Sequence, residues 1–257
     1  MATRASTTTI VFEQEHRFFF ITACVMAFVL VAGFSTNIIL GRSSFGSPIL
    51  FHIHAFAFFG WVVLYLMQTG LASTGSIALH KRLGWLALGW VPAMVILGIA
   101  ITATSVRRTG APFFFDKNEF LIGNPLGILC FAGVVAWAIA LRRRTAWHRR
   151  LMLCAMAMIT GPGFGRLLPM PFLMPWAWWT AAVVFPALFI LAGMIVDHRR
   201  MGRVHPAYLW GLAIMVGAQL AADVIAYSPV GYAITDAVTA GTPGAGRPMK
   251  AQWPARP

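Results

Sequence analysis

Residues 175–203 read PWAWWTAAVVFPALFILAGMIVDHRRMGR, and this stretch decides the fold class. An apolar run of about 20 residues is long enough for a helix to cross the hydrocarbon core of a bilayer. The run ends in the basic motif His198-Arg199-Arg200-Met201. Because Lys and Arg accumulate in cytoplasmic loops, the stretch predicts a membrane-spanning helix with a cytoplasmic basic edge.

The same motif occurs twice more, as His80-Lys81-Arg82-Leu83 and as His148-Arg149-Arg150-Leu151. Each copy lies at the edge of another long apolar segment. We interpret the three copies as topology determinants whose basic side chains extend to lipid phosphates on one side of the bilayer.

Composition supports a membrane protein. Apolar residues make up 59% of the 257 residues and charged residues only 11%, whereas about a quarter of the residues in a soluble domain are charged. The net charge of +13 comes from basic residues between the apolar segments, and no nucleic-acid-binding motif is present. The expected partners are therefore anionic lipid head groups at the cytoplasmic face. A membrane-protein partner is a further expectation. We expect no nucleic-acid partner.

Seven windows are long and apolar enough to span a membrane. They cover roughly residues 18–40, 50–72, 85–105, 119–141, 149–169, 175–196 and 206–227. We predict an all-α, polytopic transmembrane helix bundle of about seven spans within residues 18–228. Gly161-Pro162-Gly163 interrupts the fifth window and predicts a kink there; the alternative is six spans plus a re-entrant segment.

The distribution of basic residues predicts the orientation. Ten Lys and Arg lie in the loops after the second, fourth and sixth windows, against four in the opposite short loops. From this count we expect a bacterial inner-membrane protein with its amino terminus outside. We expect the first apolar run to be retained as a span, because it is about 23 residues long and no convincing small-residue cleavage site follows it. Residues 1–17 are then an external segment, and the Gly- and Pro-rich residues 229–257 are a flexible external tail.

Ionisable and polar residues within the predicted spans indicate a site. His54 and Gln68 recur at helical spacing on one face of the second span. Arg166, Glu119 and Asp223 are expected near the outer boundary, where Arg166 would pair with Asp223 or Glu119. His54 would be a titratable neighbour. The alternative is a buried salt bridge and a hydrogen-bonded histidine that only fix helix packing.

A second group of candidate residues lies at the basic edges. His80, His148, His198 and His205 are expected at one depth, where four imidazoles could ligate haem or a metal. An anionic group held by helix N-termini is another alternative. The cysteines show no metal-ligand spacing.

Tryptophans near the start of the sixth window read as an interfacial belt. They are Trp176, Trp178 and Trp179. Aromatic rings of this kind gather at membrane–water boundaries, so an interfacial position is preferred to a cofactor-binding role.

The combination of these motifs resembles a known group of sequences. His54 and Gln68 on one span, the histidine–arginine edges and Gly202-Arg203-Val204-His205-Pro206 resemble a group of uncharacterised bacterial multi-pass membrane proteins. The resemblance covers about residues 50–215, and it implies an inner-membrane bundle but no activity. A looser similarity to membrane b-type cytochromes and ferric-reductase-like proteins implies haem b, although no second span supplies a histidine at the depth of His54.

Three functions follow from these observations. The leading hypothesis is an intramembrane site, lined by the five polar residues above, that binds a small ligand or cofactor or handles protons. The alternatives are a haem-binding redox protein and a non-enzymatic subunit or assembly factor of a membrane complex. The sequence contains no G-x-S-x-G, H-E-x-x-H or P-loop pattern, which disfavours a soluble-type hydrolase. These observations do not decide whether the protein is an enzyme of another kind.

Overall fold

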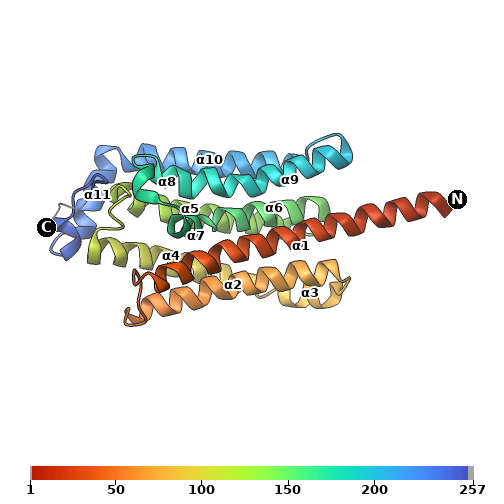
Figure 1. Ribbon diagram of the computed structural model, residues 1–257, viewed down its shortest axis with the longest axis horizontal. Coiled ribbons are helices and arrows are strands. Elements are labelled where there is room, and N and C mark those ends of the chain that lie inside the picture. Colours follow the sequence, from red (N-terminus) through yellow and green to blue (C-terminus); the bar gives the residue numbers. More distant parts are fainter. Residues whose placement is uncertain (1, 254–257) are drawn as a thin grey trace.

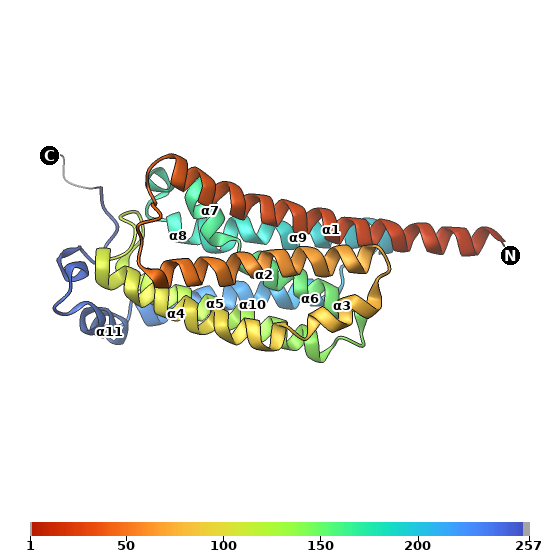
Figure 2. The same ribbon diagram turned by 90° about the horizontal axis from the view of Figure 1, so that it is seen from below.

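Long helices run side by side along one axis and form a single bundle (Figures 1 and 2). This computed structural model describes residues 2–253, with side chains described from Arg17 onward. Regular structure in this range is entirely helical, which confirms the predicted all-α class. The α-helices are α1 (Ala2–Ile39), α2 (Ile49–Ser73), α3 (Ile77–Gly84), α4 (Ala87–Thr109), α5 (Lys117–Ala140), α6 (Thr145–Met158), α7 (Gly161–Leu167), α8 (Ala177–Trp179), α9 (Phe185–Met201), α10 (Pro206–Ala226) and α11 (Pro229–Thr239). The short elements are the 3₁₀ turns η1 (Met170–Leu173) and η3 (Pro243–Gly246) and the π-helical segment η2 (Thr180–Val184).

In the described part of the chain, six helical segments of 21 to 25 residues are apolar enough to cross a membrane. They are Arg17–Ile39 of α1, all of α2, α4, α5 and α10, and the segment Ala177–Met201 that comprises α8, η2 and α9. At a rise of 1.5 Å per residue, even the shortest of them covers about 30 Å, the thickness of the hydrocarbon core. The protein is therefore a multi-pass membrane protein.

The fifth predicted span is interrupted. Helix α6 ends at Met158 and α7 begins at Gly161, with Pro162 in its first turn. Proline cannot donate the backbone hydrogen bond that would continue a helix, which explains the predicted kink. Together the two helices lead from one end of the bundle to the other (Figures 1 and 2). The passage is thus a broken span, added to six continuous ones, and it does not turn back as a re-entrant segment would.

The relation between the amino terminus and the basic loops differs from the prediction. The start of α1, helix α3, the α5–α6 loop and the α9–α10 loop all lie at one end of the bundle (Figures 1 and 2). We call this the basic end, because it carries the three histidine–arginine motifs. The expectation that the amino-terminal segment lies opposite the basic loops was wrong for residues 2–17, while residue 1 lies outside the described residues. Two crossings return a chain to its starting side, so the loops after even-numbered spans share the side of the amino terminus.

The carboxyl-terminal residues are also more ordered than expected. Residues 229–253 contain α11 and η3 and lie at the end opposite the basic end, which we call the distal end (Figure 1). The buried ammonium of Lys117 donates to the carbonyl oxygens of Gly244 and Arg247 at 3.3 and 3.0 Å. The Arg247 guanidinium donates to the carbonyl oxygens of Gly110 and Phe115. Over residues 229–253, the expected flexible tail is instead a hydrogen-bonded cap; residues 254–257 lie outside the described residues.

Candidate functional site

The eight candidate residues do not form one cluster. Four of them, His54, Glu119, Arg166 and Asp223, lie on the distal half of α2, α5, α7 and α10. The other four lie towards the basic end: Gln68, His80, His148 and His205. Gln68 is 14 residues after His54 on α2, which separates the two by about 21 Å along the helix axis.

Arg166 has neither of its expected partners among the described side chains. Its Nη1 donates to the carbonyl oxygen of Pro162 at 2.8 Å, one turn earlier in α7. Its guanidinium lies over the ring of Phe34 on α1, 4.0 Å from the ring centroid. The predicted pairing with Asp223 or Glu119 was therefore wrong. The sequence placed these groups at a similar depth, but depth does not fix the direction in which each helix presents its side chains.

Asp223 instead accepts hydrogen bonds from neutral donors. Trp179 Nε1 donates to Oδ2 at 2.8 Å, and Gln219 Nε2 donates to Oδ1 at 2.7 Å. Gln219 Oε1 in turn accepts from Trp178 Nε1 at 2.9 Å. The two tryptophans, which we expected in an interfacial belt, thus belong to a polar network between the α8 region and α10. Trp176 is 68% exposed, as a belt residue would be.

Glu119 lies in the first turn of α5 and is 5% exposed. Its neighbour Asn118 donates from Nδ2 to the carbonyl oxygen of Ala226, which joins the start of α5 to the end of α10. Just beyond the spans, Tyr227 donates its hydroxyl to Asp116 Oδ2 at 3.0 Å. Burial, together with the negative charges of Glu119 and Asp116, raises the pKa of Tyr227, so its hydroxyl keeps its proton.

Two histidines from different helices face each other at the basic end. The rings of His80 on α3 and His148 on α6 are perpendicular, with centroids 6.3 Å apart. The Nδ1 atom of His80 lies 3.2 Å from the carbonyl oxygen of Gln68, and that of His148 lies 2.9 Å from the carbonyl oxygen of Ala138. A carbonyl only accepts, so both Nδ1 atoms carry the proton. In the neutral form, each ring then has its lone pair on Nε2, the tautomer that metal-binding histidines commonly adopt.

Gln68 contributes to this histidine pair through its backbone. Its carbonyl oxygen orients His80, while its side-chain Nε2 is buried without a hydrogen-bond partner. The side chain reaches towards Gly84, one turn after His80 on α3. The predicted candidate Gln68 thus adjoins the histidine pair and not His54.

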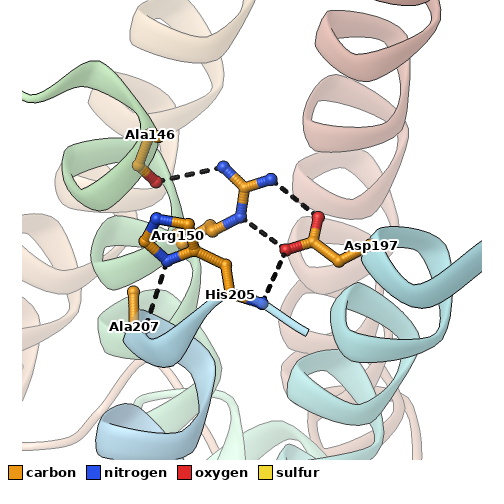
Figure 3. Close-up of polar contacts among 5 residues, drawn as sticks. All are labelled: Ala146, Arg150, Asp197, His205 and Ala207. Carbon is orange, nitrogen blue, oxygen red and sulfur yellow. Dashed lines mark hydrogen bonds and ion pairs between the residues drawn. The ribbon is translucent and has the colours of Figure 1, made fainter. Parts of the chain in front are cut away.

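The basic motif of α6, His148-Arg149-Arg150-Leu151, contains a residue whose role the sequence did not reveal. Arg150 is 1% exposed and donates from Nε and Nη2 to the two carboxylate oxygens of Asp197 at 2.8 and 2.7 Å (Figure 3). The backbone N–H of His205 also donates to Asp197 Oδ2, at 3.3 Å. Figure 3 shows how this bidentate pair ties α6, α9 and the start of α10 together. Arg150 therefore does not extend to lipid phosphates, which was our interpretation of the motif.

One signal in the sequence could have pointed to this pair. Asp197 is an acidic residue in an apolar span, directly before the basic motif, and such residues tend to be paired. His205 caps α10, because its Nδ1 accepts from the N–H of Ala207 at 3.1 Å. Partial burial and the nearby positive charge of Arg150 lower the pKa of His205, while Asp197 raises it. His205 is thus committed to the cap and does not join the histidine pair.

Among the described residues, no group of three or more His, Cys, Asp or Glu is placed to hold a metal ion. A centre at the histidine pair would therefore have two protein ligands only. That number suits haem iron, which takes its other ligands from the porphyrin, and it also suits an ion that keeps water ligands.

The fold and these sites define the class as a multi-pass α-helical membrane protein with a histidine pair at its basic end. Comparisons with protein-family models, with curated proteins and with solved structures found no match.

Proposed function

We propose that the protein is a bacterial inner-membrane protein that binds a transition metal, as haem iron or as a bare ion, through His80 and His148. The observation that carries the proposal is the pair of imidazoles whose Nδ1 atoms are both held by backbone carbonyls. This arrangement fixes the ring orientation and leaves the two Nε2 lone pairs for a metal.

The geometry of the pair suits one shared metal. The ring centroids of His80 and His148 are 6.3 Å apart, so the two imidazoles are close enough to hold one metal through bonds of about 2 Å. Imidazole nitrogen is a ligand for iron, copper and zinc. When bound, haem or a redox-active ion would supply electron transfer, while His80 and His148 would hold it.

Orientation and lipid contacts complete the proposal. By the positive-inside rule, the basic end faces the cytoplasm, together with the amino terminus, and the carboxyl-terminal cap lies outside. Lys81 and Arg82, beside His80, would then meet anionic head groups or the propionates of a haem.

The test is an absorption spectrum and a metal analysis of the protein purified in detergent, read before and after reduction. A Soret band that shifts on reduction identifies haem, and stoichiometric metal without that band identifies a bare ion. Either signal should be lost in His80→Ala and in His148→Ala. It should persist in His198→Ala, because His198 lies at the same end but is exposed. A wild-type protein with neither chromophore nor metal, after growth with added haem and metal salts, would refute the proposal.

A further inference from the structure

An apolar groove lies between α5 and α10, two spans that run side by side (Figure 2). Its volume is about 350 Å³, which is within the range of about 300–1,000 Å³ for small-ligand sites. The residues that line it include Leu126, Leu129, Cys130, Gly133 and Trp137 of α5 and Ile214 of α10. Leu129 is half exposed and Gly133 is exposed, so the groove opens onto the surface that faces lipid.

The length of the groove matches one leaflet of a bilayer. Leu126 and Trp137 are 11 residues apart on α5, which is about 17 Å at 1.5 Å per residue. Half of a hydrocarbon core of about 30 Å is about 15 Å. Because Trp137 lies in the last turn of α5, which ends at Ala140, the groove runs from the membrane boundary at the basic end to about the midplane.

Tryptophan side chains mark the end of the groove at this boundary. The ring of Trp137 contacts the rings of Trp147 on α6 and Trp210 on α10, with centroids 5.7 and 6.4 Å apart. Trp210 is 56% exposed. Tryptophan rings of this kind gather at the level of the lipid head groups. A head group at this end of the groove would therefore lie at its normal depth.

Positive charge lies directly beyond the tryptophans. The contact between Trp137 and Trp147 closes the short α5–α6 loop, which carries the exposed residues Arg142, Arg143 and Arg144. Among the acidic residues whose side chains are described, only Asp197 lies towards the basic end, and it is bound to Arg150. The charge of the loop therefore complements an anionic phosphate.

From the groove, its depth and the charge at its end we infer that α5 and α10 bind an anionic phospholipid. One acyl chain lies in the groove, and the phosphate lies at Arg142–Arg144. A second copy of the chain is a poorer occupant, because insertion into the membrane gives both copies the same orientation. Its basic end would then approach this arginine loop, and like charges disfavour such an interface.

This lipid site goes beyond the proposed metal binding and does not depend on it, since lipid binding is measured directly. The test is native mass spectrometry of the protein released from detergent micelles, titrated with dioleoyl phosphatidylglycerol or dioleoyl phosphatidylcholine. The two lipids have the same acyl chains and differ in head-group charge. We expect one saturable site that binds phosphatidylglycerol at least fivefold more tightly than phosphatidylcholine.

The groove is tested by filling it. Gly133→Leu should weaken the binding of phosphatidylglycerol at least fivefold, because a Cβ at Gly133 meets no atom within 4 Å and the larger side chain would occupy the space of the acyl chain. Gly127→Leu is the matched control. Gly127 is also an exposed glycine of α5 with no atom within 4 Å of its Cβ, but it does not line the groove.

The head-group contact is tested by removing charge from the loop. The double variant Arg143→Gln, Arg144→Gln should lose most of the preference for phosphatidylglycerol and should bind phosphatidylcholine as the wild type does. The matched control is Arg107→Gln, Arg108→Gln, which neutralises two adjacent exposed arginines at the distal end, in the last turn of α4.

Four results would overturn the inference. They are equal binding of the two lipids by the wild type, equal binding by the two leucine variants, equal preference in the two arginine double variants, and a dimer that binds no lipid. Should Gly133→Leu fail to fold, Ile214→Trp fills the groove from α10 and decides by the same comparison with Gly127→Leu.

Discussion

Replacing Asp197 by asparagine should destabilise the protein strongly. The substitution keeps the shape of the side chain but removes the charge that meets Arg150 through two hydrogen bonds of 2.8 and 2.7 Å. The side chains of Arg150 and Asp197 are 1% and 6% exposed, so water cannot replace the lost carboxylate. Removing one partner of a buried ion pair costs about 3–5 kcal/mol, because the other buried charge loses the group of opposite charge that met it. We expect a loss of this size in the free energy of unfolding.

The measurement is reversible unfolding in mixed micelles, with Lys250→Gln as the matched control. Lys250 also makes a short ion pair, 2.9 Å from Asp116, but its side chain is 63% exposed. An exposed pair contributes about 0–1 kcal/mol, so this variant should be close to wild type. The two substitutions each remove one charge from an ion pair and differ mainly in burial.

A double variant separates the charge from the packing. Arg150→Met combined with Asp197→Leu removes both charges, and it should be more stable than Asp197→Asn alone, because it leaves no buried guanidinium that has lost its carboxylate. The reasoning is refuted if Asp197→Asn costs no more than Lys250→Gln. It is also refuted if the double variant loses the sum of the two single losses, since coupled partners are not additive.

Two further predictions concern the cap of α10 and the break after α6. Partial burial and the positive charge of Arg150 lower the pKa of His205. Below about pH 6.5 the unfolded state therefore binds more protons than the folded state, and the stability of the protein falls. His205→Asn keeps a capping acceptor but does not titrate, so the melting temperature of this variant should fall less than that of the wild type between about pH 7.5 and 5.5. An equal fall in both proteins would contradict this assignment. Gly33→Ala should cost about 1–3 kcal/mol, because its Cβ would lie 2.5 Å from the carbonyl oxygen of Gly163 where α1 meets α7. Gly127→Ala, whose Cβ meets no atom within 4 Å, is the control, and similar melting temperatures for the two variants would argue against that close contact.

Local features of the sequence predicted the membrane class and the break in the fifth span. The length of an apolar run determines whether a helix can cross a bilayer, and this property needs no knowledge of neighbouring helices. The break also has a local cause, since Pro162 cannot continue the hydrogen-bond ladder of α6. The carboxyl-terminal cap was missed because residues 229–253 are held by contacts with α4 and α5, far away in the sequence.

Only the tertiary structure decided which polar residues meet. Arg149 and Arg150 are adjacent in one motif, yet Arg150 turns inward to Asp197, 47 residues later. His80 and His148 face each other across 68 residues, whereas Arg166 and Asp223 do not meet. The sequence by itself determined the number and approximate depth of these groups, because apolar length and basic edges position each helix along the membrane normal. Their pairing depended on how each helix is rotated about its axis, which side-chain packing between helices sets.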